Sequence, residues 1–516
     1  MIEARWAEYR LFDYERHLGR RELHALTGVQ PNEERQGLLL PTESMPHQKM
    51  LIDLLAERTT YFQEISGGGQ TMTTLQSETE SAHWRLRGAT RRRQATRFGV
   101  HGVHEYRGKF NPQMARALVN VVDHSADVLL DPFCGSGTTL LEGLRLGLTV
   151  VGVDRSPLAQ HLASVKVAAL RHPDPRDLAT EFTEISRAVA EVLKCTQDKG
   201  TAESPGHLTS DATTYLAAWF TQPALAALFA ALNYLRPQHA SIAGQLAGLA
   251  LSSILRKVSL QAPEDLRIRR RPPGFVAPSL ADHFLAAAER IALGLEELTG
   301  MPPPTQAAHV ALGSADDPKL LEHEVPAGRR LIVTSPPYAT ALPYIDTDRL
   351  SLIALDLAAP KQTHSLEATL LGSREWNRSD TAYWNHARQA NSADLPAQLL
   401  DLLIEIENRN QRLGAGFRRA AVPSLLYRYF TKMGDCFTAW STLLASGERA
   451  VLVVGRNRTG PAHARVTIDT PRLLGEVAET RGFRVDELIP FETWPRYGLH
   501  SSNGVRGEDA LVISRK

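Results

Sequence analysis

Short apolar runs alternate with longer amphipathic stretches along most of the chain. Each run is flanked by turn residues or by an acidic residue, and the stretches between the runs have helical periodicity. The runs near 128–130, 149–153, 310–312, 330–333, 448–457, 483–491 and 508–516 are predicted strands. About seven strands with intervening helices predict an α/β fold with a mostly parallel sheet.

The first 65 residues are predicted to form a small N-terminal α/β unit without a recognisable site. Strands are expected over 9–14 and 37–42, and helices over 19–26 and 47–65. Residues 66–99 are interpreted as a linker followed by a basic segment, because 66–81 is rich in Gly, Ser and Thr.

The remainder of the chain divides into two core segments and an insertion. The core is expected in residues 100–171 and 306–516, separated by a helical insertion over 172–305. Ala/Leu-rich stretches give the insertion its helical periodicity, and the arginine-rich segment 264–274 lies between them. Both a target-recognition region and a structural lid fit this pattern.

Composition limits the classes of partner. The chain has 516 residues, is 43% hydrophobic and carries a formal net charge of +1, so contacts to nucleic acid would depend on local basic patches. The three cysteines have no metal-ligand spacing, and no metal site is expected. There is neither a signal-type apolar segment at the start nor an apolar run long enough for a bilayer. These features predict a cytoplasmic protein without a membrane partner.

Residues 128–154 carry the strongest pattern for a ligand. A strand ending at Asp131 is followed by a Gly135-Ser136-Gly137 turn, a helix, a second strand and then Asp154. Asp154 lies 19 residues after Gly135, close to the separation of about 20 that places a carboxylate on a ribose. A dinucleotide site would need a third glycine where this chain has Leu140, so a dehydrogenase is excluded.

The string Asp-Pro-Phe-Cys-Gly-Ser-Gly-Thr-Thr (131–139) resembles the S-adenosylmethionine loop of amino-methyltransferases, and implies a Rossmann-like methyltransferase fold. The resemblance implies that S-adenosyl-L-methionine is the cofactor, with Asp131 at its methionine end, Phe133 packed on it and Asp154 on its ribose. Segment 101–120 resembles the segment that precedes this loop in DNA amino-methyltransferases. The cofactor-binding residues implied in this way are Lys109, Phe110, Asp131, Phe133, Gly135, Gly137, Thr138, Asp154 and Asp316, with Tyr106 and Pro112 beside them. Because Asp317 follows Asp316 directly, it stays open which of these two acids binds the cofactor.

Ser335, Pro336, Pro337 and Tyr338 follow a buried strand and are the candidate catalytic residues. An exocyclic amine of a base is a poor nucleophile, because its lone pair is delocalised into the ring. Acceptors such as the Ser335 hydroxyl and the Pro336 carbonyl favour the more tetrahedral nitrogen that attacks a methyl group, and the prolines keep these acceptors oriented. Tyr338 can stack on a base rotated out of the duplex.

The longer string 334–352 resembles DNA methylases of the N4/N6 group. In that resemblance a serine at the first loop position is typical of cytosine-N4 enzymes, whereas Asp or Asn is typical of adenine-N6 and guanine-N2 enzymes. The implied substrate is double-stranded DNA, with a cognate restriction nuclease as a candidate partner. Two basic clusters are candidates for phosphate contacts, although arginine runs are often only solvated surface; they contain Arg91, Arg92, Arg93, Arg267, Arg269, Arg270 and Arg271.

Three alternatives stay open on sequence grounds. A tRNA guanine-N2 methyltransferase shares the Asp-Pro-Phe-Cys-Gly string, but Ser335 argues against it. A DNA adenine-N6 methyltransferase would use the same loop geometry. A non-catalytic nucleic-acid-binding relative is disfavoured by the intact loops, and cytosine-C5 chemistry is excluded because no Pro-Cys pair is present.

Overall fold

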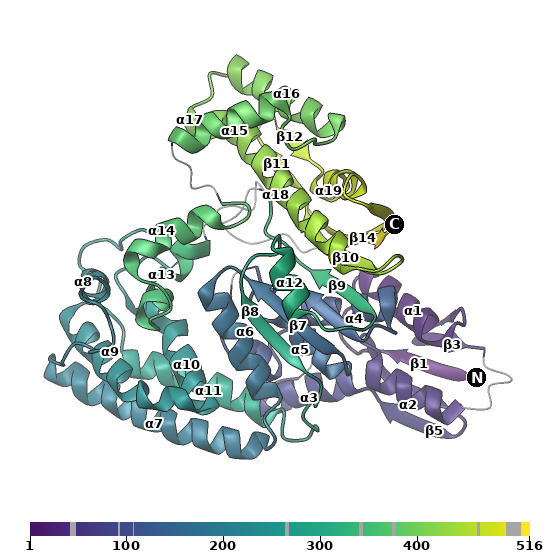
Figure 1. Ribbon diagram of the computed structural model, residues 1–516. Coiled ribbons are helices and arrows are strands. Elements are labelled where there is room, and N and C mark those ends of the chain that lie inside the picture. Colours follow the sequence, from purple (N-terminus) through teal and green to yellow (C-terminus); the bar gives the residue numbers. More distant parts are fainter. Residues whose placement is uncertain are drawn as a thin grey trace.

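The computed structural model describes residues 1–41, 48–90, 93–106, 108–263, 268–339, 344–373, 378–461, 465–491 and 507–516. A central seven-stranded sheet has the order β13-β14-β10-β9-β6-β7-β8 (Figure 1). Its strands are β6 (Val128–Asp131), β7 (Thr149–Asp154), β8 (Ala308–Leu312), β9 (Arg330–Thr334), β10 (Arg449–Gly455), β13 (Phe483–Phe491) and β14 (Glu508–Arg515).

The five strands from β8 to β10 are parallel, and β14 is antiparallel to both of its neighbours. This topology confirms the predicted Rossmann-like methyltransferase fold. Because the five strands are parallel, their carboxyl ends meet at one edge, where ligands of such sheets bind. Asp131, Asp154 and Thr334 are the last residues of three of these strands.

Helices cover both faces of the sheet, and successive strand residues enter different cores. Leu129 and Val150 belong to one core and Leu130 and Val151 to the other. The first face is covered by α4 (Pro112–Asp123), α5 (Thr138–Arg145) and α6 (Pro157–Leu170), and the second by α12 (Pro318–Glu324), α18 (Val422–Leu443) and α19 (Thr470–Glu479).

The N-terminal unit is a five-stranded antiparallel sheet of order β2-β3-β1-β4-β5. Its elements are β1 (Ile2–Trp6), α1 (Asp13–Thr27), β2 (Asn32–Glu34), β3 (Gly37–Leu40), α2 (Gln48–Arg58), β4 (Phe62–Gly67), β5 (Gln70–Thr73) and α3 (Leu75–Leu86). The strand expected over 9–14 is wrong, because the first strand is β1 and α1 already begins at Asp13.

Two further boundaries differ from the expectation. The helix predicted over 47–65 ends at Arg58, and its last residues belong to β4. The stretch 66–81, expected to be a linker, contains the β4–β5 turn, β5 and half of α3. Gly68 and Gly69 form this turn with positive φ angles of 57° and 80°, as a tight hairpin requires.

The helical character predicted for 172–305 is present in α7 (Pro175–Lys199), α8 (Ser210–Trp219), α9 (Gln222–Leu235), α10 (Ile242–Val258) and α11 (Leu280–Glu296). Two later helices pack against this group, namely α13 (Tyr344–Ala354) and α14 (Pro360–Thr369) (Figure 1). The short 3-10 turns Gly99–Gly102 and Pro237–Ala240 complete this side of the molecule.

A second group of helices stands on the other side of the carboxyl edge, at the top of Figure 1. It consists of α15 (Arg378–Ala390), α16 (Ala397–Arg412), α17 (Phe417–Ala420) and the first half of α18, and we call it the upper lobe. A two-stranded ribbon, β11 (Asn457–Thr459) with β12 (Val466–Ile468), follows β10. Within the described residues, every helix is too short or too polar to cross a lipid bilayer.

Candidate functional site

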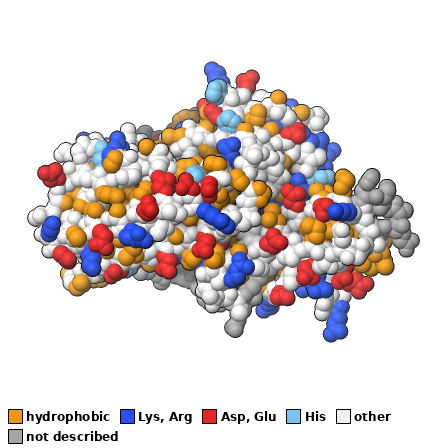
Figure 2. All heavy atoms as spheres, turned by 90° about the horizontal axis from the view of Figure 1, so that it is seen from below, with side chains coloured by type: hydrophobic (Ala, Val, Ile, Leu, Met, Phe, Trp, Pro, Cys, Tyr) orange, Lys and Arg blue, Asp and Glu red, His pale blue; other side chains and the backbone are white. Residues whose placement is uncertain are grey.

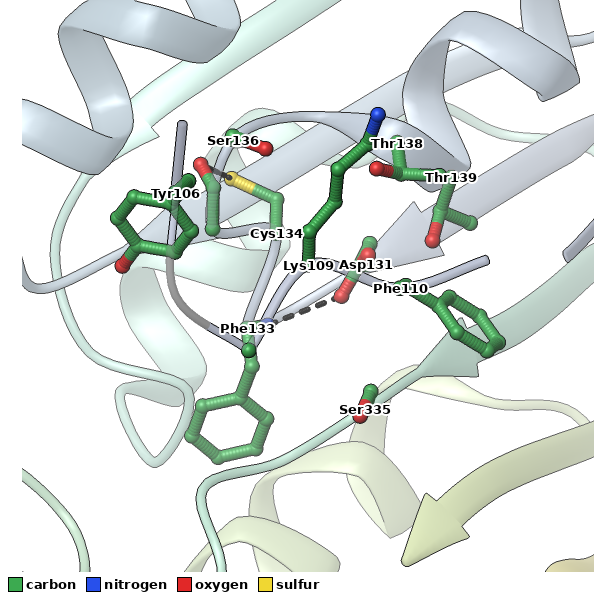
Figure 3. A pocket seen from close by; sticks show the side chains of 12 residues that line it. Tyr106, Lys109, Phe110, Asp131, Phe133, Cys134, Ser136, Thr138, Thr139 and Ser335 are labelled. Atoms are coloured by element: carbon green, nitrogen blue, oxygen red, sulfur yellow. Dashed lines mark hydrogen bonds between the residues drawn. The ribbon is translucent and has the colours of Figure 1, made fainter. Parts of the chain in front are cut away.

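A pocket lies at the carboxyl edge of the sheet, where the loop after β6 meets the loop after β9 (Figure 3). It is lined by Tyr106, Gly108, Lys109, Phe110, Asp131, Phe133, Cys134, Gly135, Ser136, Thr138, Thr139 and Ser335. Two segments predicted to act on one reaction, which lie about 200 residues apart in the sequence, thus meet in one cavity. Gly137, Asp154, Asp316, Pro336, Pro337 and Tyr338 are not among the lining residues.

Asp131 connects the two loops. Its Oδ1 accepts a 2.6 Å hydrogen bond from the Thr334 hydroxyl and a 3.2 Å bond from the Phe133 amide. Burial raises the pKa of Asp131 to about 6, although these hydrogen bonds favour the carboxylate. Such a carboxylate gains from a cation placed beside it, and Figure 3 draws Asp131 above the rings of Phe110 and Phe133.

The glycine turn is shaped by its neighbours as well as by backbone conformation. Gly135 and Gly137 have φ angles of 49° and 82°, which residues other than glycine rarely adopt. A Cβ on Gly135 would lie 3.1 Å from the Tyr106 ring, and one on Gly137 would lie 3.0 Å from the Ala163 Cβ on α6. The glycines therefore allow both the turn and its close packing.

The Asp154 carboxylate fixes the backbone of this turn by hydrogen bonds. Its carboxylate accepts 2.8 Å hydrogen bonds from the amides of Gly135 and Ser156, and burial raises its pKa. The side chain therefore fixes the loop in the described structure. Its predicted hydrogen bonds to ribose hydroxyls stay a prediction.

Lys109 lines the pocket, but its ammonium group has other partners. Nζ donates 2.8 Å hydrogen bonds to the carbonyls of Thr96 and His101. Burial lowers the pKa of this lysine well below its ordinary value. Lys109 thus ties residues 108–110, which line the pocket, to Thr96 and His101, and its contact with the cofactor stays a prediction.

The side chains of Ser335 and Tyr338 donate hydrogen bonds to two neighbouring strands of the sheet. The Ser335 hydroxyl donates a 3.2 Å hydrogen bond to the Val453 carbonyl on β10, and the Tyr338 hydroxyl donates to the Glu508 carboxylate on β14. The Tyr338 ring lies beside Gly455, where a Cβ would be 3.6 Å away. Residues 340–343 of the longer methylase-like string lie outside the described residues.

Asp316 and Asp317, between which the sequence leaves the cofactor-binding acid open, have separate surroundings. Asp317 caps α12, because its carboxylate accepts hydrogen bonds from the amides of Lys319 and Leu320. Asp316 instead accepts a hydrogen bond from Ser314 and lies 3.6 Å from the ammonium group of Lys432 on α18. Sequence reasoning missed Lys432, which lies more than 100 residues away and follows no motif.

The structure describes the two arginine clusters only in part. Arg91, Arg92 and Arg267 lie outside the described residues. Arg93 lies over the Trp84 ring at 6.0 Å, and Arg269 is exposed.

Arg270 and Arg271 fasten the hairpin after α10 to the helices beside it. Arg271 donates to the carbonyls of Ser259 and Lys257, and Arg270 donates to the Ala218 carbonyl. These contacts satisfy helix carbonyls. The phosphate contacts predicted for both arginines are untested and would compete with this structural role.

Comparison with known proteins supports a relationship to DNA methylases. The N6/N4 family model described as DNA methylase matches residues 46–164, a range that includes the glycine turn and ends before Ser335. The Type II methyltransferase M.MjaII of Methanocaldococcus jannaschii is 41% identical over 68 residues, which is 13% of each chain. The Type II methyltransferase M.MvaI of Kocuria varians is 26% identical over 293 residues, or 53% of this chain and 62% of that protein.

A tRNA (guanine(10)-N2)-dimethyltransferase of Methanothermobacter thermautotrophicus is 46% identical over 50 residues, 10% of this chain and 15% of that protein. The chain thus spans less than two thirds of the curated relatives it matches. Among solved structures, the rRNA methyltransferase aviRa of Streptomyces viridochromogenes is 12% identical, with a TM-score of 0.28 over 80% of this chain and 88% of that chain.

Proposed function

We propose that the protein is an S-adenosylmethionine-dependent DNA methyltransferase that modifies an exocyclic amine of a base, namely N4 of cytosine. The Thr334–Asp131 hydrogen bond carries the proposal, because it fixes the serine loop against the glycine turn. The matching DNA methylase model and the two Type II methyltransferases support DNA as the substrate. A role in restriction–modification, with a cognate nuclease as partner, is part of the same proposal.

The lining residues fit this cofactor. Ser136 Oγ is buried and has no hydrogen-bond partner within the described residues, so a bound ligand would satisfy it. We assign Asp131 Oδ2 to the ammonium group at the methionine end, since the two hydrogen bonds described above use Oδ1. Phe110 and Phe133 provide rings that attract a sulfonium cation.

S-adenosylmethionine supplies an electrophilic methyl group when bound. The chain's own task is to align and activate the amine. Because the Ser335 proton is donated to the Val453 carbonyl, the lone pairs of Oγ are left to accept an N–H of the amine. The Pro336 carbonyl accepts the other N–H, and Tyr338 stacks on the extruded base.

Analysis of modified nucleosides tests this function. DNA of mixed sequence is incubated with the protein and labelled S-adenosylmethionine, digested and examined by mass spectrometry. We expect N4-methylcytosine. N6-methyladenine would retain the enzyme class and overturn the base, whereas N2-methylguanosine in tRNA with unmodified DNA would favour the tRNA alternative.

A further inference from the structure

The turn between α16 and α17 is a basic, aromatic surface at the end of the upper lobe. Residues 411–420 contain three arginines and no acidic residue, and we call them the α16–α17 tip. Phe417 is 68% exposed and Leu413 is 42% exposed. Arginine with exposed aromatic side chains is a composition typical of binding surfaces.

The arginines of the tip are free to bind a partner. Arg412, Arg418 and Arg419 are exposed, and within the described residues none of their side chains has an ion pair or hydrogen bond. This distinguishes them from Arg270 and Arg271, which donate to helix carbonyls. Nothing in the described structure competes for the three guanidinium groups.

The tip has a fixed backbone. The buried Asn410 donates from its side chain to the Arg419 carbonyl at 2.8 Å, and the Ala415 amide donates to the Asn410 carbonyl at 2.9 Å. Gly414 turns the chain with a φ angle of 56°. A fixed turn loses less conformational entropy on binding than a disordered segment would.

The tip also projects beyond the edge of the sheet where the pocket opens. Lys432 on α18 lies 3.6 Å from Asp316, just past the carboxyl end of β8. The ten residues from Val422 to Thr431 continue the helix away from that contact, a rise of about 15 Å. Figure 1 shows α17 at the left end of the upper lobe, above α14.

The opposite face of the molecule has a different character. Figure 2 shows acidic and basic side chains interspersed there, without a large area of one sign. A polyanion gains little from such a surface. The face drawn in Figure 2 therefore offers a polyanion no basic patch comparable with the three exposed arginines of the tip.

We propose that the α16–α17 tip grips the phosphate backbone of double-stranded DNA beside the target base. Arg412, Arg418 and Arg419 contact phosphates of the duplex, and the exposed Phe417 packs against a groove of the duplex. This inference rests on the proposed function, and it moves the main DNA contact from the predicted arginine clusters to the upper lobe. Phosphate contacts do not depend on base sequence, so the recognition sequence is not needed for a test.

The test compares a triple variant, R412A/R418A/R419A, with a control of equal charge, R176A/R187A/R290A. The control arginines are exposed on α7 and α11, at the bottom of Figure 1. Binding of a fluorescent 30-base-pair duplex of mixed sequence is measured by polarisation between 50 and 200 mM salt. Circular dichroism verifies that each variant is folded.

We expect the tip variant to bind more weakly across sequences, with the slope of log K against log salt reduced by about 2 to 3, roughly one for each arginine. The control should keep the wild-type slope. Phe417→Ala should weaken binding without changing the slope, because it removes no charge.

A wild-type slope in the folded tip variant, or an equal loss in the control, overturns the inference. Loss of tRNA binding with duplex binding intact overturns the choice of partner. Failure of the proposed function is a separate result, because it would appear as unmodified DNA with the wild-type protein and S-adenosylmethionine.

Discussion

The Thr334 hydroxyl donates a 2.6 Å hydrogen bond to Asp131 Oδ1, and both side chains are buried. Thr334 is the last residue of β9 and Asp131 is the last residue of β6, its parallel neighbour. The bond joins the end of the strand before the serine loop to the start of the glycine turn. Any change in this bond should therefore alter both the binding of the cofactor and the placement of Ser335.

Thr334→Val should make cofactor binding more sensitive to acid. The hydrogen bond favours the carboxylate, so its loss raises the Asp131 pKa above its present value of about 6. Binding of an ammonium group needs the charged form and is lost as the pH falls through this pKa. Calorimetry between pH 5.5 and 8.5 should show the midpoint raised by about one unit or more, since a bond to a charged group contributes about 1.5–3 kcal/mol.

Thr334→Ser keeps the hydroxyl and serves as the matched control. Its midpoint should stay near that of the wild type. Equal midpoints in the valine variant and the wild type would show that Asp131 does not meet a cation.

The glycine turn and its fold could be predicted because the evidence is local. An apolar strand, two glycines and a second strand with Asp154 lie within 27 residues of one another. The contacts of Thr334 with Asp131 and of Lys432 with Asp316 could not, because each joins residues more than 100 positions apart. Such pairs depend on the order of strands in the sheet, which no local pattern contains.

The N-terminal errors have a different physical origin. Strand β1 has the small Ala4 at one of its buried positions, which gives a weak apolar signal. Phe62 and Ile65 of β4 are three residues apart, a spacing that also fits a helix. The Gly68-Gly69 pair, by contrast, is a known hairpin signal that the interpretation as a linker overlooked.

Glu22→Gln should change how the stability of the protein depends on pH. Glu22 on α1 is buried and accepts hydrogen bonds from Thr60 and from Asn120 on α4, at the boundary between the N-terminal unit and the core. Burial raises its pKa to about 7. A raised pKa contributes stability below the unfolded value of about 4.5 that is lost as the pH rises through 7.

The glutamine variant lacks this titration. Relative to the wild type, its unfolding midpoint should therefore rise between pH 5 and pH 8, with a change on the order of a few kcal/mol in the free energy of unfolding. Thermal unfolding followed by circular dichroism at both pH values measures it. A constant difference between the two proteins would mean that Glu22 is already charged at pH 5.

Ser335→Ala should separate turnover from cofactor binding. The side chain accepts from the amine in our proposal, and loss of one such contact typically lowers the rate by about 10²–10³. The affinity for S-adenosylmethionine should change little, because the cofactor contacts are assigned to the opposite loop. Single-turnover rates with mixed-sequence DNA, together with calorimetry, measure the two effects.

Ser365→Ala is a suitable control for the serine variant, since this serine on α14 is exposed and donates to the Gln362 carbonyl in its own helix. Its turnover should match that of the wild type. A full rate with Ser335→Ala would remove the serine from the mechanism and leave the Pro336 carbonyl as the acceptor.

Tyr338 should depend on Glu508 for its orientation. The tyrosine hydroxyl donates to this carboxylate, and the ring lies beside Gly455. Tyr338→Ala removes the stacking surface and should weaken capture of the extruded base by about 1–3 kcal/mol. Tyr338→Phe keeps the ring and releases only the bond to Glu508, so it should have a smaller effect.

Glu508→Gln keeps an acceptor for the hydroxyl and should resemble the wild type more closely than Glu508→Ala. Fluorescence of 2-aminopurine at the target position reports extrusion directly, once nucleoside analysis has located that position. If Tyr338→Ala extrudes the base as well as the wild type does, the stacking role assigned to this ring is wrong.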